Sequence, residues 1–206
     1  MLGVYNYTVI LTYIGMLTGF TGITCAIHND LKGALICLMI AGVCDMFDGK
    51  IASTMERTRE EERFGIQIDS FSDLICFGVL PAVLIFTTGS TNWILVPTML
   101  YVLCALIRLA WFNVDEEMRQ DEEGGCRTIY YGLPVTTAAL IFPVVICLCA
   151  KENWMINRLS SVVMVITAIA FLTPFQIKKP GLPGKIGIIV LGVCGLLFVL
   201  STGMSI

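Results

Sequence analysis

Seven apolar segments dominate the chain, each with about the 20 residues that a helix needs to cross a bilayer. They run roughly over Tyr7–Ile27, Lys32–Ala52, Ile66–Thr87, Trp93–Phe112, Ile129–Ala150, Met155–Phe175 and Ile186–Met204. Only 14% of the 206 residues are charged, against about a quarter in a typical water-soluble domain. We therefore expect an all-α, polytopic transmembrane helical bundle of six to eight spans, seven as drawn here, forming a single membrane domain over residues 1–206.

The stretch between the second and third segments is charged but contains no helix breaker. No glycine or proline falls between Lys50 and Phe64, and "KIASTMERTREEERF" is rich in helix-forming residues. The second helix is therefore expected to continue past the membrane surface. The fourth segment is expected to end where the apolar run closes with "RLAWFN".

Basic residues are unequally divided between the two sides of the expected bundle. With the second-to-third connection placed in the cytoplasm, ten fall on that side and three on the other. The ten are Lys50, Arg57, Arg59, Arg63, Arg108, Arg119, Arg127, Lys178, Lys179 and Lys185, and the three are Lys32, Lys151 and Arg158. Cytoplasmic loops of membrane proteins are enriched in Lys and Arg. The bias thus predicts a cytoplasmic N-terminus, and we expect a multi-pass protein of the plasma membrane.

Four aspartates interrupt the second and third apolar segments. Asp45 and Asp48 are three residues apart and Asp69 and Asp73 are four apart, so each pair shares one face of a helix. Consecutive spanning helices are antiparallel, and all four carboxylates are therefore expected at one depth near the cytoplasmic surface. Carboxylates are costly in a membrane and usually mark function there.

Bound divalent cations are the simplest way to stabilise four such carboxylates. No basic residue within these segments obviously neutralises them, and unpaired buried anions are strongly destabilising. An all-oxygen ligand set suits Mg²⁺ or Mn²⁺ rather than zinc. Two ions about 3.5–4 Å apart can clamp the attacking and leaving oxygens of an in-line phosphoryl displacement. Small residues nearby leave room for a phosphate or nucleotide, namely Gly49, Ala52, Ser53 and Gly65.

The acidic cluster also fits two roles that involve no phosphoryl transfer. Aspartates at helix ends can act as caps and solvated charges, although this role suits one pair better than two facing pairs. Acidic clusters also occur in cation transporters, where they are expected near the bilayer midplane, in broken helices. The position of these aspartates at the cytoplasmic ends, in a sequence without an internal repeat, favours an enzyme.

The residues around the aspartates resemble the signature of the CDP-alcohol phosphotransferase family. That signature reads D-x-x-D-G-x-x-A-R, then G-x-x-x-D-x-x-x-D, and it is matched over 45–73 by Asp45, Asp48, Gly49, Ala52, Gly65, Asp69 and Asp73. Ser53 stands in place of the family arginine, and the eleven residues between it and Gly65 make the gap longer than the family's. Arg57, one turn beyond Ser53, is our candidate for the missing cation.

Within the family, the surroundings resemble integral-membrane phosphatidylserine synthases, in "GIQIDSFSDLICFGVLPA", "IRLAWFN" and "YYGLPV". The resemblance implies transfer of the phosphatidyl group of CDP-diacylglycerol to the hydroxyl of L-serine, giving phosphatidylserine and CMP. The alternative is the same chemistry with another acceptor, glycerol 3-phosphate or an inositol phosphate. Ser70 and Leu74 differ from the residues usual in enzymes that use those two acceptors.

The resemblance also implies roles for individual residues. Asp45, Asp48 and Asp69 hold two Mg²⁺ or Mn²⁺ ions, and Asp73 both ligates a metal and is the candidate catalytic base. Binding of the CDP group is expected from residues at the junction of the second and third helices, namely Gly49, Ala52, Ser53, Arg57 and Gly65.

Weaker candidates for contacts to serine or phosphate are chosen by their cytoplasmic level alone, and they are Arg108, Asn113, Tyr130 and Tyr131. Snorkelling explains Arg108 equally well, and an interfacial aromatic belt explains the tyrosines. The expected partners are CDP-diacylglycerol, L-serine and the lipid bilayer, with no nucleic acid. Members of the family are often homodimers, and the active site is expected to face the cytoplasm.

Overall fold

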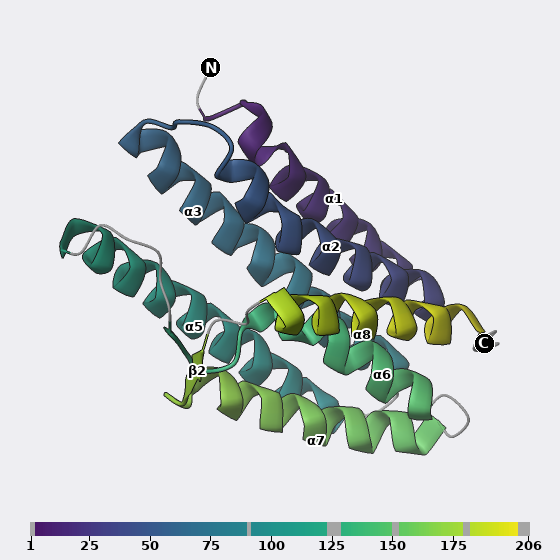
Figure 1. Cartoon of the computed structure of the whole chain (residues 1–206). Helices are drawn as coiled ribbons and strands as arrows, with labels where there is room; N and C mark the ends of the chain where they lie inside the picture. The colour runs from purple at the N-terminus through teal and green to yellow at the C-terminus, as the bar shows by residue number, and fades with distance from the viewer. Residues whose placement is uncertain (1–2, 90–91, 123–128, 150–152, 179–181, 202–206) are drawn as a thin grey trace.

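The structure, a computed structural model, describes residues 3–89, 92–122, 129–149, 153–178 and 182–201. Helices make up nearly all of it (Figure 1). They are α1 (Tyr7–Ile27), α2 (Leu31–Ala52), α3 (Arg59–Asp73), α4 (Leu80–Thr88), α5 (Leu95–Glu122), α6 (Ala138–Cys149), α7 (Asn153–Leu172) and α8 (Leu182–Ser201). A π-helical segment, η1 (Leu74–Val79), joins α3 to α4 without a break. The described chain therefore makes seven helical passes, and the predicted all-α bundle is confirmed.

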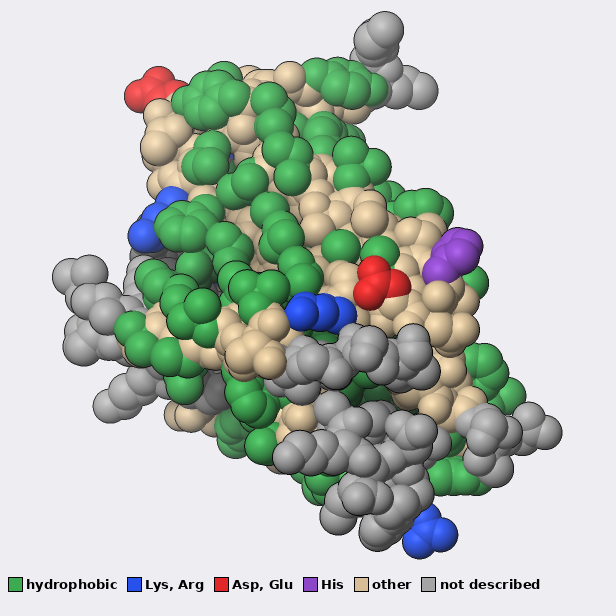
Figure 2. Space-filling model, turned by 90° about the vertical axis from the view of Figure 1, so that its right-hand side faces the viewer, with side chains coloured by type: hydrophobic (Ala, Val, Ile, Leu, Met, Phe, Trp, Pro, Cys, Tyr) green, Lys and Arg blue, Asp and Glu red, His purple; other side chains and the backbone are tan. Residues whose placement is uncertain are grey.

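Three of these passes are long and apolar enough to cross a membrane, over Tyr7–Ile27, Arg59–Thr88 and Leu95–Arg119. Shorter apolar helices cover Val135–Cys149, Arg158–Leu172 and Ile189–Ser201. Hydrophobic side chains spread over much of the face shown in Figure 2, with few charged ones between them. An apolar surface of this extent marks contact with a membrane rather than with water. The chain is thus built as a membrane protein.

The second helix ends at Ala52 and does not continue through the charged stretch, so the predicted extension past the membrane surface is wrong. The charged residues that follow α2 open α3. Thr58 and Glu61 form a capping box, in which the Glu61 N–H donates to Thr58 Oγ1 (3.2 Å) and the Thr58 N–H donates to Glu61 Oε2 (2.9 Å). This box satisfies the free N–H groups of a helix start. Asn6, just before α1, also donates to Glu61 Oε1 (3.1 Å), which ties the new helix start to the first helix.

Two further boundaries differ from the prediction. α5 runs past Phe112 to Glu122, and an ion pair between Arg63 of α3 and Glu117 of α5 (3.0 Å) supports this extension. The segment expected to be helical from Ile129 begins instead as a strand, β1 (Ile129–Tyr131), which pairs antiparallel with β2 (Gln176–Lys178). Helix starts only at the 3₁₀ turn η3 (Val135–Thr137), because "GLP" intervenes. Its glycine, Gly132, has a φ of 73°, which favours a turn rather than a helix.

A stripe of small residues on α1 brings it close to both helices that carry aspartates. A Cβ added at Gly19 would overlap the Cys76 sulfur and lie 3.2 Å from the Cys76 Cα of η1. A Cβ added at Gly22 would lie 2.9 Å from the Cys37 Cβ of α2. Membrane helices approach closely where small residues face the neighbour, so these glycines fix the distance of α1 from the aspartate helices.

Replacement of Gly19 by alanine is therefore expected to lower the thermal unfolding midpoint of the detergent-solubilised protein. Forcing a methyl group into a packed interface costs about 1–3 kcal/mol. The matched control is Gly187→Ala in α8, where an added Cβ meets no atom within 4 Å. That change should leave the midpoint unchanged or raise it, because alanine favours helix. Equal midpoints for both variants would show that α1 is not closely packed at Gly19.

The apolar core lies where α2, η1, α5, α6 and α7 meet. Its largest fully buried side chains include Leu35, Leu38, Phe77, Tyr101, Phe142 and Met164. The N-terminus and the α2–α3 turn lie at one end of the molecule and the C-terminus at the other (Figure 1). The aspartates of α2 and α3 therefore sit between this core and the end of the bundle that holds the α2–α3 turn.

Candidate functional site

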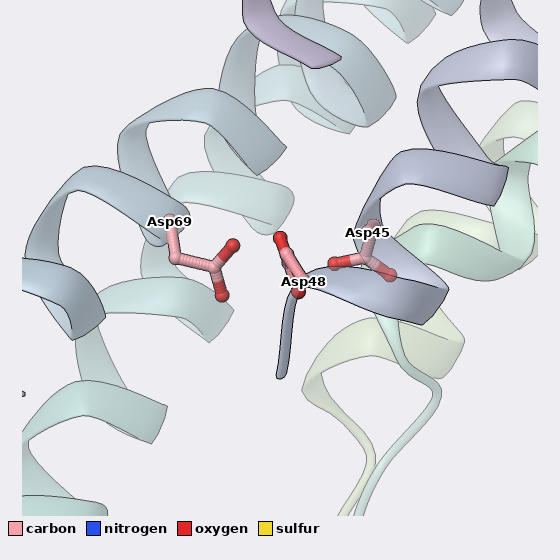
Figure 3. Close-up of side chains that lie close together, drawn as sticks. All are labelled: Asp45, Asp48 and Asp69. Atoms are coloured by element: carbon pink, nitrogen blue, oxygen red, sulfur yellow. The ribbon is translucent and has the colours of Figure 1, made fainter. Parts of the chain in front are cut away.

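Three carboxylates from two neighbouring helices converge at one point (Figure 3). Asp45 and Asp48 project from the last turns of α2, and Asp69 projects from α3. One carboxylate oxygen of each lies within 4.8 Å of those of the other two. The spacings of three and four residues place each pair on the inner face of its helix, as the helical period requires.

Asp73 completes the group one turn after Asp69. Its carboxyl is in hydrogen-bond contact with that of Asp45, and the Asp48 carboxyl is in similar contact with that of Asp69. Asp48 and Asp73 are each only 9% exposed. Two ionised carboxylates at such distances repel each other, so each pair needs a shared proton or a cation between its members.

A small cavity of about 10 Å³ lies among the four aspartates, which is room for about one water-sized sphere. No lysine or arginine is found among the described residues that line it. The donor set consists chiefly of carboxylate oxygens, the ligands that hard divalent cations prefer. The residues present therefore fit a divalent cation, and they offer no protein cation that could take its place.

Hydroxyl groups of α1 and α3 lie beside the carboxylates. Thr12 Oγ1 donates to Asp48 Oδ2 (3.3 Å), and Ser72 Oγ donates in turn to the Thr12 carbonyl (3.4 Å). Both residues also line the cavity. Neither was among the predicted site residues, and polarity alone could not have indicated Thr12, because α1 carries four other threonines, at positions 8, 18, 21 and 24.

The residues expected to bind the CDP group surround the α2–α3 turn. A Cβ added at Gly49 would meet no atom within 4 Å, so space lies open beside its backbone. A Cβ added at Gly65 would lie 3.2 Å from an Arg57 guanidinium nitrogen, so the Arg57 side chain reaches forward to the second turn of α3. Ser53 Oγ donates to the Lys50 carbonyl (2.7 Å) of its own helix end. Ala52, which ends α2, is half-buried.

The weaker candidates are placed differently from one another. Asn113 accepts a hydrogen bond from Ser70 Oγ (2.8 Å), next to Asp69 on α3. Arg108 is 7% exposed, with its guanidinium carbon 5.7 Å from the centre of the Phe112 ring, and it does not line the aspartate cavity.

The two tyrosines lie in β1 rather than in a helix. The Tyr131 ring contacts Trp111 of α5 edge-on, with 6.2 Å between ring centres, and it does not line the aspartate cavity either. The side chain of Tyr130 falls outside the described part of the structure.

An apolar groove of about 280 Å³ runs beside the carboxylates, between α1 and the helix formed by α3 and η1. It is lined by Thr12, Tyr13, Met16, Leu17, Ile68, Phe71, Ser72 and Ile75. Two of these, Thr12 and Ser72, also line the aspartate cavity. A hydrocarbon surface and an acidic cavity thus share a wall.

Comparison with known proteins places this arrangement in a family. The family model for CDP-alcohol phosphatidyltransferases matches residues 5–174. A CDP-diacylglycerol–serine O-phosphatidyltransferase of Methanocaldococcus jannaschii is 29% identical over 194 residues, which are 94% of this chain and 84% of the relative. An enzyme of the same name from Saccharomyces cerevisiae is 34% identical over 148 residues, covering 66% of this chain and 52% of the relative.

An archaetidylserine synthase of Methanothermobacter thermautotrophicus is 33% identical over 135 residues, covering 64% of this chain and 53% of the relative. The chain thus spans about half the length of the yeast relative and of this archaeal one, and most of the Methanocaldococcus protein. The matched region contains all four aspartates and the turn between their helices. The chain belongs to the CDP-alcohol phosphatidyltransferase family.

Proposed function

We propose that this protein transfers the phosphatidyl group of CDP-diacylglycerol to the hydroxyl of L-serine and releases CMP. The observation that carries the proposal is the convergence of Asp45, Asp48 and Asp69 in a half-buried, carboxylate-lined site of a family member. Relatives named for transfer to serine, at 29% and 34% identity, support serine as the acceptor. We propose that residues 1–206 form a single membrane domain that carries out this reaction.

Two divalent cations, Mg²⁺ or Mn²⁺, are proposed for the aspartate site. Asp45, Asp48 and Asp69 would hold them, together with Asp73, whose carboxyl lies against that of Asp45. When bound, the ions supply positive charge that offsets the diphosphate and stabilises the attacking and leaving oxygens. The fixed carboxylates would set the positions of the ions and thereby orient the substrate, which lowers the entropic cost of bringing two reactants together.

Asp73 is the proposed general base. Its carboxyl, deep in the cavity, accepts the proton of the serine hydroxyl as the hydroxyl oxygen forms a bond to the lipid-linked phosphorus. The bond from that phosphorus to the CMP oxygen breaks, and CMP leaves with the electron pair. Burial of the cavity keeps water from competing with serine as the nucleophile.

The apolar groove between α1 and α3 is proposed to receive hydrocarbon of the lipid substrate. Its wall is shared with the aspartate cavity through Thr12 and Ser72, so a lipid seated there would have its head group beside the carboxylates. Asn113, which is hydrogen-bonded to Ser70 next to Asp69, is the nearest of the proposed contacts for serine. Arg108, Tyr130 and Tyr131 are also proposed to contact serine or phosphate, on the basis of their expected level in the membrane alone.

An assay with purified protein tests the function directly. The protein is given CDP-diacylglycerol or its ether-linked counterpart with serine, glycerol 3-phosphate, inositol phosphate or no acceptor, and the lipid product is identified by mass spectrometry. Serine-dependent CMP release is the expected result. If product forms only with another acceptor, that compound and not serine is the acceptor substrate. Absence of any CMP release, together with divalent cation flux into proteoliposomes, would point to transport.

Arg57 is proposed to contact the diphosphate in place of the missing family arginine. Loss of a charge-assisted hydrogen bond should raise the KM for CDP-diacylglycerol about tenfold in Arg57→Ala. Arg59→Ala is the matched control, because Arg59 is an exposed cation in the first turn of α3. Steady-state kinetics of both variants separates them, and equal small effects would remove Arg57 from the site.

The active site is proposed to face the cytoplasm from the plasma membrane. Glu60 is exposed at the start of α3, and a cysteine introduced there in a background without native cysteines should react with an impermeant reagent only after the inner face is opened. A cysteine in place of His28, exposed at the other end of α2, should show the opposite pattern. Labelling of Glu60→Cys in intact cells would show that the topology is the reverse of the one proposed. The proposed homodimer is tested separately by the mass of the purified protein in detergent.

A further inference from the structure

The helix that carries Asp69 and Asp73 changes its winding directly after the second of them. Leu74–Val79 forms a π-helical segment, in which the Leu80 N–H donates to the Ile75 carbonyl, five residues earlier. π-Segments inside α-helices are rare and concentrate at functional sites. Phe77, within this segment, lines the aspartate cavity.

A proline just beyond the π-segment leaves a backbone carbonyl short of a donor. Pro81 lies at the start of α4 and has no N–H. In the α-helical winding that resumes with α4, a bond from position 81 would reach the carbonyl of Phe77, four residues earlier. In the interior of a membrane helix, a carbonyl without a partner is strongly destabilising.

Tyr101 of α5 supplies the missing donor. Its hydroxyl donates to the Phe77 carbonyl at 2.7 Å. The side chain is completely buried, and its ring is fixed between Phe142 of α6 (5.5 Å between ring centres) and Phe171 of α7 (5.4 Å). The hydroxyl can therefore point in one direction only, toward the π-segment.

The approach of α5 to the π-segment is close enough to fix it. One turn beyond Tyr101, Ala105 Cβ would lie 3.5 Å from a Cβ added at Gly78. The two helices thus meet at consecutive residues of the π-segment, by packing at Gly78 and by a hydrogen bond at Phe77.

We infer that the Tyr101 hydroxyl is a positioning group for the phosphatidyl transfer reaction. It holds the backbone of Phe77, which forms a wall of the cavity, and so fixes the π-segment that directly follows Asp73. The chain Tyr101–Phe77–Asp73 connects the core of the bundle to the proposed base. This inference rests on the proposed function, because only a reaction at Asp73 makes small errors in its placement costly.

A double-mutant cycle with Tyr101→Phe and Pro81→Ala tests the inference. Tyr101→Phe keeps the ring and removes only the hydroxyl. We expect kcat for CMP release to fall about tenfold and the KM for CDP-diacylglycerol to stay within about twofold. Pro81→Ala restores an N–H that can donate to the Phe77 carbonyl. In that background the loss of the hydroxyl should lower kcat by no more than about threefold.

A matched control is Tyr7→Phe, which removes an exposed hydroxyl that contacts Thr54 Oγ1 at 3.2 Å, and which should leave kcat unchanged. A kcat of Tyr101→Phe close to that of the wild type would overturn the inference. So would equal losses with and without Pro81→Ala, because the Phe77 carbonyl would then not be the link. If the KM rose together with the fall in kcat, the result would indicate that Tyr101 stabilises the fold in general and does not position Asp73.

Failure of the proposed function is recognised separately, because wild-type CMP release is measured first. If the wild type releases none, the inference is judged on Mn²⁺ affinity, followed by electron paramagnetic resonance. Tyr101→Phe should weaken Mn²⁺ binding about threefold or more, and less in the Pro81→Ala background. An unchanged affinity would overturn the link between Tyr101 and the carboxylates.

Discussion

Removal of divalent cations is expected to abolish CMP release, by about 10³-fold or more, and added Mg²⁺ or Mn²⁺ should restore it. Asp45, Asp48 and Asp69 bring carboxylate oxygens within 4.8 Å of one another, and no lysine or arginine is found among the described residues of the cavity. Within the cavity, the charge that offsets the substrate diphosphate must then come from bound cations, with Arg57 proposed to add to it from outside, and the contribution of such cations to a phosphoryl transition state is several kcal/mol.

Binding of the cations should also be measurable without substrate, from the thermal stability of the protein. A ligand that binds only the folded state raises stability with its concentration, so the thermal unfolding midpoint should rise as Mg²⁺ is added after treatment with EDTA. Circular dichroism checks that the chelated protein keeps its helices, which separates loss of the ions from loss of the fold. Full turnover in metal-free buffer would rule out the proposed ions, whatever the midpoint does.

The membrane-spanning helices could be predicted from the sequence because the apolar runs define them. The predicted first segment and α1 have the same bounds, Tyr7–Ile27, and α2 starts one residue before its prediction. The convergence of the aspartates also followed from local rules, since spacings of three and four residues set the face of a helix and consecutive spans are antiparallel. The roles assigned to these aspartates stay predictions until they are measured.

The α2–α3 turn shows where local reasoning gave the wrong answer. The absence of glycine and proline favoured one continuous helix, yet the sequence "TREE" at Thr58–Glu61 is a visible capping box. A helix start does not need a breaker before it when a side chain can satisfy its free N–H groups. The extension of α5 to Glu122 was missed for a related reason, since polar residues end a membrane span but not a helix.

The link from Tyr101 to the π-segment could not be predicted from the sequence. Pro81 indicates that a carbonyl near Phe77 lacks a partner, but the donor comes from a helix 24 residues along the chain from Phe77. Which side chain supplies it depends on the packing of Tyr101 against Phe142 and Phe171. Such contacts are set by the assembled core rather than by any local pattern.

Asp73 and Asp48 are expected to respond differently when each is replaced by asparagine. Asp73→Asn keeps the size of the side chain and one ligating oxygen but removes the proton acceptor. It should retain binding of CDP-diacylglycerol in Mg²⁺ while kcat falls by about 10²–10⁴, the range for loss of a general base. Asp48→Asn should weaken cation binding instead, because Asp48 lies between Asp45 and Asp69 in the cluster (Figure 3).

A Mg²⁺ titration of both variants separates these roles, with CMP release and nucleotide-lipid binding as readouts. The activity of Asp48→Asn should recover in part as Mg²⁺ is raised, since mass action can offset a weaker site. The activity of Asp73→Asn should not recover, because no concentration of cation replaces the lost base. If extra Mg²⁺ rescues Asp73→Asn as readily as Asp48→Asn, then Asp73 is only a fourth ligand. The proton of the serine hydroxyl must in that case be taken by another group in the cavity.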